Sequence, residues 1–145
     1  MENWIHQVQY YETDMMQIVH HANYIKWFEE GRIHLMNEIN FGYDEMEAAG
    51  VIVPVLSVNA EYRSMVRFGE KVEIETKIKE LSGVKLILSY EIRDLETQKI
   101  RCIGESKHTF LDAETYRTIS LKKNHNEIYE LFEKVIEEQN KEEDK

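Results

Sequence analysis

The chain has 145 residues, of which 42% are hydrophobic and 32% charged, and its formal net charge is −10 at pH 7. This length suits one domain with its own core, and a globular composition with a single proline excludes a disordered chain or an extended linker. The acidic surface repels phosphate at long range, so we do not expect nucleic acid as a partner.

No stretch of the sequence approaches the ~20 apolar residues of a membrane span, and residues 1–12 lack the basic and apolar regions of a signal peptide. Cys102 is the single cysteine, so an intrachain disulfide is impossible. We therefore expect a cytoplasmic protein without stable membrane insertion. Because Cys102 lies in an alternating strand pattern with no adjacent base, we expect a packed core thiol and not a nucleophile.

The first predicted elements are a strand over residues 4–11 and a long helix over residues 23–38, with Asn23 as its N-cap. Apolar residues repeat at helical spacing along one face of this helix, which consists of Tyr24, Trp27, Phe28, Gly31 and Leu35. Glycine destabilises a helix interior by roughly 1 kcal/mol. The position of Gly31 on the buried face therefore predicts that a neighbouring sheet packs closely against the helix there.

The remaining pattern predicts a short second helix ending at Gly50 and then a change to period-two alternation. Four strands are expected over residues 51–66, 70–81, 84–94 and 99–112, joined in order as an antiparallel meander. An amphipathic stripe near the end predicts a terminal helix, for which Asn124 and Glu127 resemble a capping box. Acidic residues dominate the last segment, 137–145.

A strand, one long buried helix and a four-stranded meander form an α+β layer in which the sheet wraps the helix. This arrangement resembles the hotdog fold, as a single domain over residues 1–145. The segment YETDMMQIVHHANY, residues 11–24, resembles the opening motif of 4-hydroxybenzoyl-CoA thioesterase-like hotdog proteins. The segment EYRSMVRFGE, residues 61–70, is similar to the strand-turn-strand segment of that family. Family members have glycine where this chain has Gln17; glycine allows a positive φ or close approach to substrate.

The resemblance implies that the chain is an acyl-CoA thioesterase in which Asp14 acts as nucleophile or general base. It also implies that the backbone N–H at His21 polarises the thioester carbonyl, and that the His21 side chain orients water or protonates the leaving thiolate. The expected substrate contacts are Gln17, Tyr24, Arg63 and Arg67. No cofactor and no metal are expected, and the resemblance implies homodimers, or homotetramers built from them, with the site at the subunit interface.

Several alternatives remain open from the residues alone. Asp14 can be a loop residue that only accepts hydrogen bonds, and His20 and His21 can serve the loop in the same way. Glu29 and Glu30 are expected on a solvated helix face, although a helix carboxylate is the catalyst in another hotdog branch. The thiol carrier can be an acyl-carrier protein, or the chain can be a non-catalytic acyl-binding or scaffold protein. The acyl group is not determined.

Overall fold

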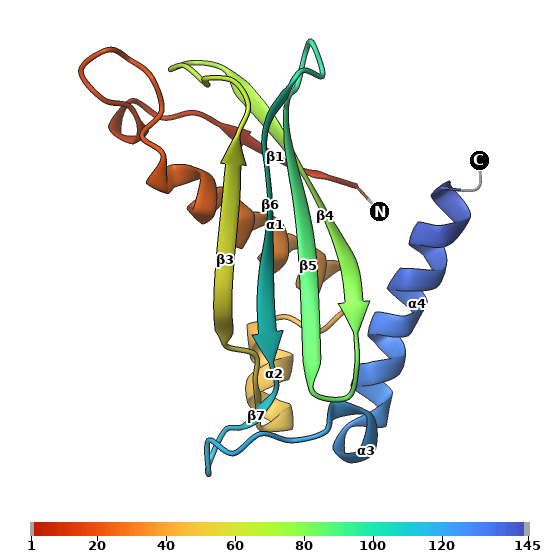
Figure 1. Cartoon of the computed structure of the whole chain (residues 1–145). Coiled ribbons are helices and arrows are strands. Elements are labelled where there is room, and N and C mark those ends of the chain that lie inside the picture. Colours follow the sequence, from red (N-terminus) through yellow and green to blue (C-terminus); the bar gives the residue numbers. More distant parts are fainter. Residues whose placement is uncertain (1, 144–145) are drawn as a thin grey trace.

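The computed structural model describes residues 2–143, which form one five-stranded antiparallel sheet, a second sheet of two short strands, and four α-helices (Figure 1). The strands are β1 (Trp4–Gln7), β2 (Val51–Ile52), β3 (Val55–Tyr62), β4 (Lys71–Leu81), β5 (Lys85–Asp94), β6 (Ile100–Thr109) and β7 (Leu111–Asp112). The helices are α1 (Ala22–Glu38), α2 (Tyr43–Ala49), α3 (Leu121–Asn124) and α4 (Asn126–Glu143), with a 3-10 turn at Tyr10–Glu12.

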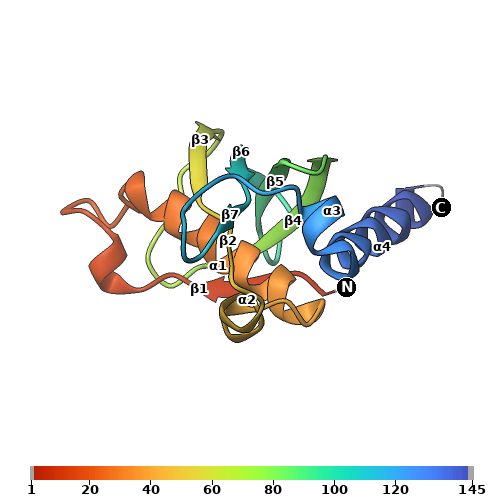
Figure 2. The same ribbon diagram turned by 90° about the horizontal axis from the view of Figure 1, so that it is seen from below.

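Helix α1 packs against one face of the main sheet, whose strands curve around it (Figure 2). Trp27 and Phe28 are buried, and the Phe28 ring stacks on Tyr90 of β5 with a centroid distance of 4.5 Å. A Cβ atom at Gly31 would lie 2.6 Å from the Thr76 Oγ1 atom of β4, so only glycine allows this approach. The predicted hotdog fold is confirmed, and so is the close approach at Gly31.

The order of strands in the main sheet is β1-β4-β5-β6-β3. The hairpins β4-β5 and β5-β6 follow the predicted meander, but β3 pairs with β6 and not with β4. The cause is the connection over residues 63–70, which is longer than a tight hairpin turn. The backbone N–H groups of Arg63 and Ser64 still donate to the Arg101 carbonyl, so the chain continues beside β6 before it crosses to β4.

Three predicted strands are shorter than expected. Residues 51–66 divide into β2 and β3 around Val53–Pro54, because proline has no N–H to donate to a ladder. Residues 99–112 divide into β6 and β7, and β7 pairs with β2 outside the main sheet. The strand predicted over residues 4–11 ends at Gln7, and the 3-10 turn that follows is stabilised by the Glu12 carboxylate, which accepts the Gln9 N–H.

Three of the four helices were predicted, and α3 was not. Helix α1 begins at Ala22 with His21 as N-cap, and Asn23 instead donates from its side chain to the Glu12 carbonyl at 2.8 Å. Helix α2 ends before Gly50, whose φ of 70° is the left-handed conformation that glycine favours. Asn124 ends α3 and does not begin the terminal helix, so the predicted capping box with Glu127 is wrong.

Helix α4 lies along the part of β4 that β1 does not cover. Phe132 and Val135 are buried there, and the Gln139 amide exchanges two hydrogen bonds with the Ile78 backbone, at 2.8 and 3.0 Å. The acidic segment continues α4 as far as Glu143, and residues 144–145 lie outside the described part of the chain.

Cys102 of β6 is fully buried, and burial raises the pKa of its thiol to about 12, which confirms a core thiol. Within residues 2–143, no helix has the length and apolar character needed to cross a membrane.

Candidate active site

The Asp14 loop, residues 13–20, connects the 3-10 turn to α1 and rests on the connection between β3 and β4 (Figure 1). Thr13 and Val19 form a bridge that closes the loop, and the backbone N–H of Asp14 donates to the Ile18 carbonyl at 2.9 Å. Val19 donates its N–H to the Val66 carbonyl at 2.8 Å, which holds the loop against the connection between β3 and β4. The loop therefore has a defined shape although most of its side chains are exposed.

The two carboxylate oxygens of Asp14 differ in what they contact. Oδ1 accepts the backbone N–H of Met16 at 2.8 Å and that of Ile18 at 3.3 Å, which is the hydrogen bonding of an Asx turn. For Oδ2 there is no hydrogen-bond donor among residues 2–143, and the side chain is exposed. Asp14 thus has the loop-stabilising role considered above, and its second oxygen remains available for chemistry.

Gln17 is at the turn of this loop with a φ of 62°, in the left-handed region. This conformation costs a residue with a Cβ atom roughly 1 kcal/mol or more, and glycine adopts it without that cost. The Gln17 carbonyl accepts the Phe68 N–H at 3.2 Å, while its side chain is exposed. The backbone of Gln17 therefore has a conformation that glycine would adopt at lower cost.

His21 is the N-cap of α1, and its backbone N–H has no acceptor among the described residues. The carbonyl of His21 accepts the Tyr62 hydroxyl at 3.2 Å, which fixes this end of the helix to β3. The imidazole is exposed and stacks on that of His20 at a centroid distance of 4.2 Å. A free N–H at a helix N-terminus carries partial positive charge and can bind a developing oxyanion.

A shallow groove of about 250 Å³ opens beside this helix end. Its lining consists of Ile18, Val19, His21, Tyr24, Tyr62, Arg63, Ser64 and Met65. The groove brings together His21, Tyr24 and Arg63 from the predicted set. Asp14, Gln17 and Arg67 belong to the adjoining loop and connection, and they do not line the groove itself.

The other predicted substrate contacts differ in how free they are. Tyr24 is buried against Trp27, and burial raises the pKa of its hydroxyl. The hydroxyl oxygen accepts the Val66 N–H at 3.3 Å. Arg63 is exposed and pairs with Glu61 at 3.2 Å. The Arg67 guanidinium is exposed and has no ionic partner within residues 2–143, so it is the freer of the two cations.

Sequence reasoning missed the role of Glu12, which is buried although it carries a carboxylate. Burial alone would raise the pKa of Glu12, but hydrogen bonds from the Gln9 N–H, His6 and Trp27 outweigh it and lower the pKa. Glu30, expected on a solvated face, lies 3.2 Å from the other ring nitrogen of His6. The spacing of Gln9 and Glu12 matches a capping box, and this was the available signal.

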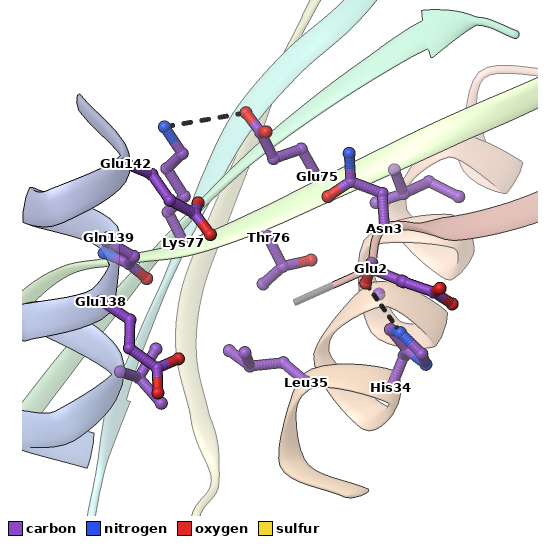
Figure 3. Close-up of a pocket in the computed structure, with 13 residues that line it drawn as sticks. Glu2, Asn3, His34, Leu35, Glu75, Thr76, Lys77, Glu138, Gln139 and Glu142 are labelled. Atoms are coloured by element: carbon purple, nitrogen blue, oxygen red, sulfur yellow. Dashed lines mark hydrogen bonds and ion pairs between the residues drawn. The ribbon is translucent and has the colours of Figure 1, made fainter. Parts of the chain in front are cut away.

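A second cavity, of about 100 Å³, lies between α1, β4 and α4 and is shown in Figure 3. Glu2, His34, Thr76, Glu138 and Gln139 are among the residues that line it. None of the predicted site residues lines this cavity. Within the described part of the chain, no group of three or more His, Cys, Asp or Glu side chains is arranged to hold a metal ion.

Comparisons with known proteins identify the family of the chain. Residues 8–133 match the sequence model of the thioesterase-like superfamily. The chain belongs to this family. It is 34% identical over 129 residues to the protein YneP of Bacillus subtilis, which covers 89% of this chain and 93% of YneP. It is 31% identical over 124 residues to the acyl-CoA thioesterase YbgC of Helicobacter pylori, which covers 81% of this chain and 91% of YbgC.

Among solved structures, the DHNA-CoA thioesterase from Staphylococcus aureus superposes with a TM-score of 0.87 at 28% identity. The superposition covers 97% of this chain and 93% of that enzyme. The family resemblance read from residues 11–24 is thereby confirmed, and several of the relatives are named as acyl-CoA thioester hydrolases.

Proposed function

We propose that the chain hydrolyses acyl-CoA thioesters, with Asp14 as the reacting carboxylate and the His21 backbone N–H as the oxyanion donor. One observation carries this proposal: among the described residues, Asp14 Oδ2 has no donor and the backbone N–H of the N-cap His21 has no acceptor, and one short loop connects the two. Thioester hydrolysis needs an attacking oxygen and a donor for the carbonyl oxygen, and this segment supplies both.

In the proposed reaction, the thioester carbonyl oxygen accepts the His21 N–H. Asp14 Oδ2 removes a proton from water while the water oxygen bonds to the carbonyl carbon, or Oδ2 itself bonds to that carbon. The tetrahedral intermediate collapses, the C–S bond breaks, and the thiolate of CoA takes a proton. If Asp14 is the nucleophile, water then hydrolyses the acyl-aspartyl anhydride. We assign the donation of this proton to the exposed His21 imidazole, because His21 lines the groove.

The substrate contacts follow from charge and apolar surface. CoA carries phosphates. Arg67, which has no ionic partner within the described residues, and Arg63 beside the groove are suited to bind them in a protein whose net charge is −10. The apolar walls formed by Tyr24, Tyr62 and Met65 suit the start of an acyl chain. Gln17 would contact the substrate with its exposed amide.

We further infer that two copies pair through β3. This strand is the edge of the main sheet, pairs with β6 alone within the described residues, and exposes Val55, Leu56, Val58 and Tyr62. An exposed apolar edge strand is a template for a second strand, and a two-fold axis pairs it with its own copy. Since Tyr62 also lines the groove, the partner subunit would border the site. Leu56→Lys should shift the mass in sedimentation equilibrium to that of a monomer and reduce turnover.

A panel of acyl-CoAs tests the proposed activity, with release of free thiol as the readout. Acetyl-, hexanoyl-, palmitoyl- and benzoyl-CoA separate chain length from aromatic character. We expect saturable hydrolysis of at least one member. Hydrolysis of an acylated carrier protein alone, with none of the free acyl-CoAs turned over, would favour the carrier-protein reading instead. Binding without turnover on every substrate would favour the non-catalytic one.

A further inference from the structure

Glu12 connects the elements that surround the proposed site. Its Oε1 atom accepts from His6 Nε2 of β1 at 2.7 Å and from the Gln9 backbone N–H at 2.8 Å. Its Oε2 atom accepts from Trp27 Nε1 of α1 at 2.7 Å. The side chain is 5% exposed. One buried carboxylate therefore holds β1, the 3-10 turn and α1 together.

The backbone of Glu12 makes a second set of contacts, which reach the other end of the Asp14 loop. Its carbonyl accepts the His20 N–H at 2.9 Å and the Asn23 side-chain amide at 2.8 Å. His20 directly precedes His21, and Asn23 lies in the first turn of α1. Asp14 follows Glu12 by two positions. The placement of Glu12 thus sets the start of the loop and its end at the same time.

Only a carboxylate satisfies this environment. Three N–H donors converge on the two oxygens of Glu12, and an ionised carboxylate accepts at every position without presenting a donor. A glutamine amide has the same shape, but its NH₂ group would face a donor, either Trp27 Nε1–H or the pair from His6 and Gln9. An opposed pair of donors in a buried site leaves both unsatisfied, so the loop must move.

We propose that Glu12 is a positioning residue for thioester hydrolysis, which holds the Asp14 carboxylate and the His21 N–H at the separation that attack on the carbonyl requires. This inference rests on the function proposed above. Glu12 is buried and does not line the groove, so it acts through the loop and does not touch substrate. A misplacement of about 1 Å in a catalytic group can reduce the rate by about 100-fold.

Steady-state kinetics of Glu12→Gln on the best acyl-CoA of the panel test this role. We expect kcat to fall at least tenfold while KM stays within about threefold, because the groove and the arginines are unchanged. Trp27→Phe removes the donor that would oppose the new amide. The double variant Glu12→Gln/Trp27→Phe should therefore recover part of the kcat lost in Glu12→Gln, and Trp27→Phe alone should lose only a few-fold.

Two controls separate positioning from general loss of stability. Glu30→Gln removes the other carboxylate next to His6. The Glu30 side chain is 36% exposed and, among the described residues, has no hydrogen bond or ion pair with the loop, so kcat should stay within about twofold. Phe132→Leu lowers the thermal midpoint from a site on α4 far from the loop, and should keep kcat per folded molecule.

Wild-type kcat in Glu12→Gln would overturn the positioning role. So would a kcat loss that merely equals the unfolded fraction, as in Phe132→Leu. If Glu12→Gln does not fold, Trp27→Phe decides alone: an unchanged kcat in that variant counts against the role. A wild-type chain without hydrolysis of any acyl-CoA would refute the proposed function itself, which distinguishes the two failures.

Discussion

Gln17→Gly should stabilise the protein, although glycine usually destabilises a folded chain. The φ of 62° at Gln17 costs a residue with a Cβ atom roughly 1–2 kcal/mol, and glycine removes that cost. Glycine also raises the entropy of the unfolded chain, which offsets about 0.5–1 kcal/mol of the gain. The net stabilisation is about 0.5–1 kcal/mol, or about 2–3 °C in thermal midpoint for a chain of this size. The exposed amide makes no hydrogen bond within the described residues that would reduce this gain.

The neighbouring Met16 provides a matched control for this prediction. Met16 lies in the same loop, is exposed, and does not have a positive φ. Met16→Gly should therefore lose about 0.5–1 kcal/mol by unfolded-state entropy alone. Thermal unfolding of both variants, followed by circular dichroism, should show a higher midpoint than wild type for Gln17→Gly and a lower one for Met16→Gly. Equal destabilisation in the two variants would refute the backbone argument. The same Gln17→Gly protein should change the ranking of acyl-CoAs, and an unchanged ranking would remove the Gln17 side chain from the site.

Three further predictions concern the scaffold. Gly31→Ala should destabilise the fold by about 1–3 kcal/mol in urea unfolding, because the new Cβ meets Thr76 Oγ1 at 2.6 Å; a neutral effect would contradict the close packing. The Thr97 N–H and Arg101 hold the pKa of Asp94 at about 2, below its usual 3.8, so Asp94 contributes stability above pH 4 that is lost as pH falls toward 2. Asp94→Asn should therefore cost roughly 2 kcal/mol at pH 7 and little near pH 2, and a cost independent of pH would contradict this sign. Cys102 should resist iodoacetamide at pH 8 until urea unfolds the chain; rapid labelling of the native protein would contradict its burial.

Periodicity predicted the parts of the fold in which one face is buried. Burial of one side of α1 forces apolar residues into helical spacing, and β4 and β5 bury alternate residues in the same way. Periodicity did not predict the strand order, because β3 pairs with β6, a strand that is distant from it in the sequence. Pro54 carried a usable signal for the break between β2 and β3.

The sequence predicted where the candidate site lies, but not the hydrogen bonds of Glu12 that hold it together. The motif placed Asp14 and His21 on a loop before α1, and the structure has them there. The sequence did not predict the positive φ of Gln17, because a residue with a Cβ atom adopts this conformation less readily than glycine. The burial of Glu12 depends on donors from β1 and α1 as well as from the 3-10 turn, and no local pattern combines such distant donors.

Turnover by Asp14→Asn tests the central claim most directly. The amide oxygen can still accept the N–H groups of Met16 and Ile18, so the loop should keep its shape and the thermal midpoint should change little. The variant lacks the negative oxygen needed for attack, and kcat for acyl-CoA hydrolysis should fall at least ~100-fold with KM nearly unchanged. Asp44→Asn, an exposed change of the same kind on α2, should keep full activity. A destabilised Asp14→Asn protein that retains its activity per folded molecule would show that Asp14 only supports the loop, and would contradict the account.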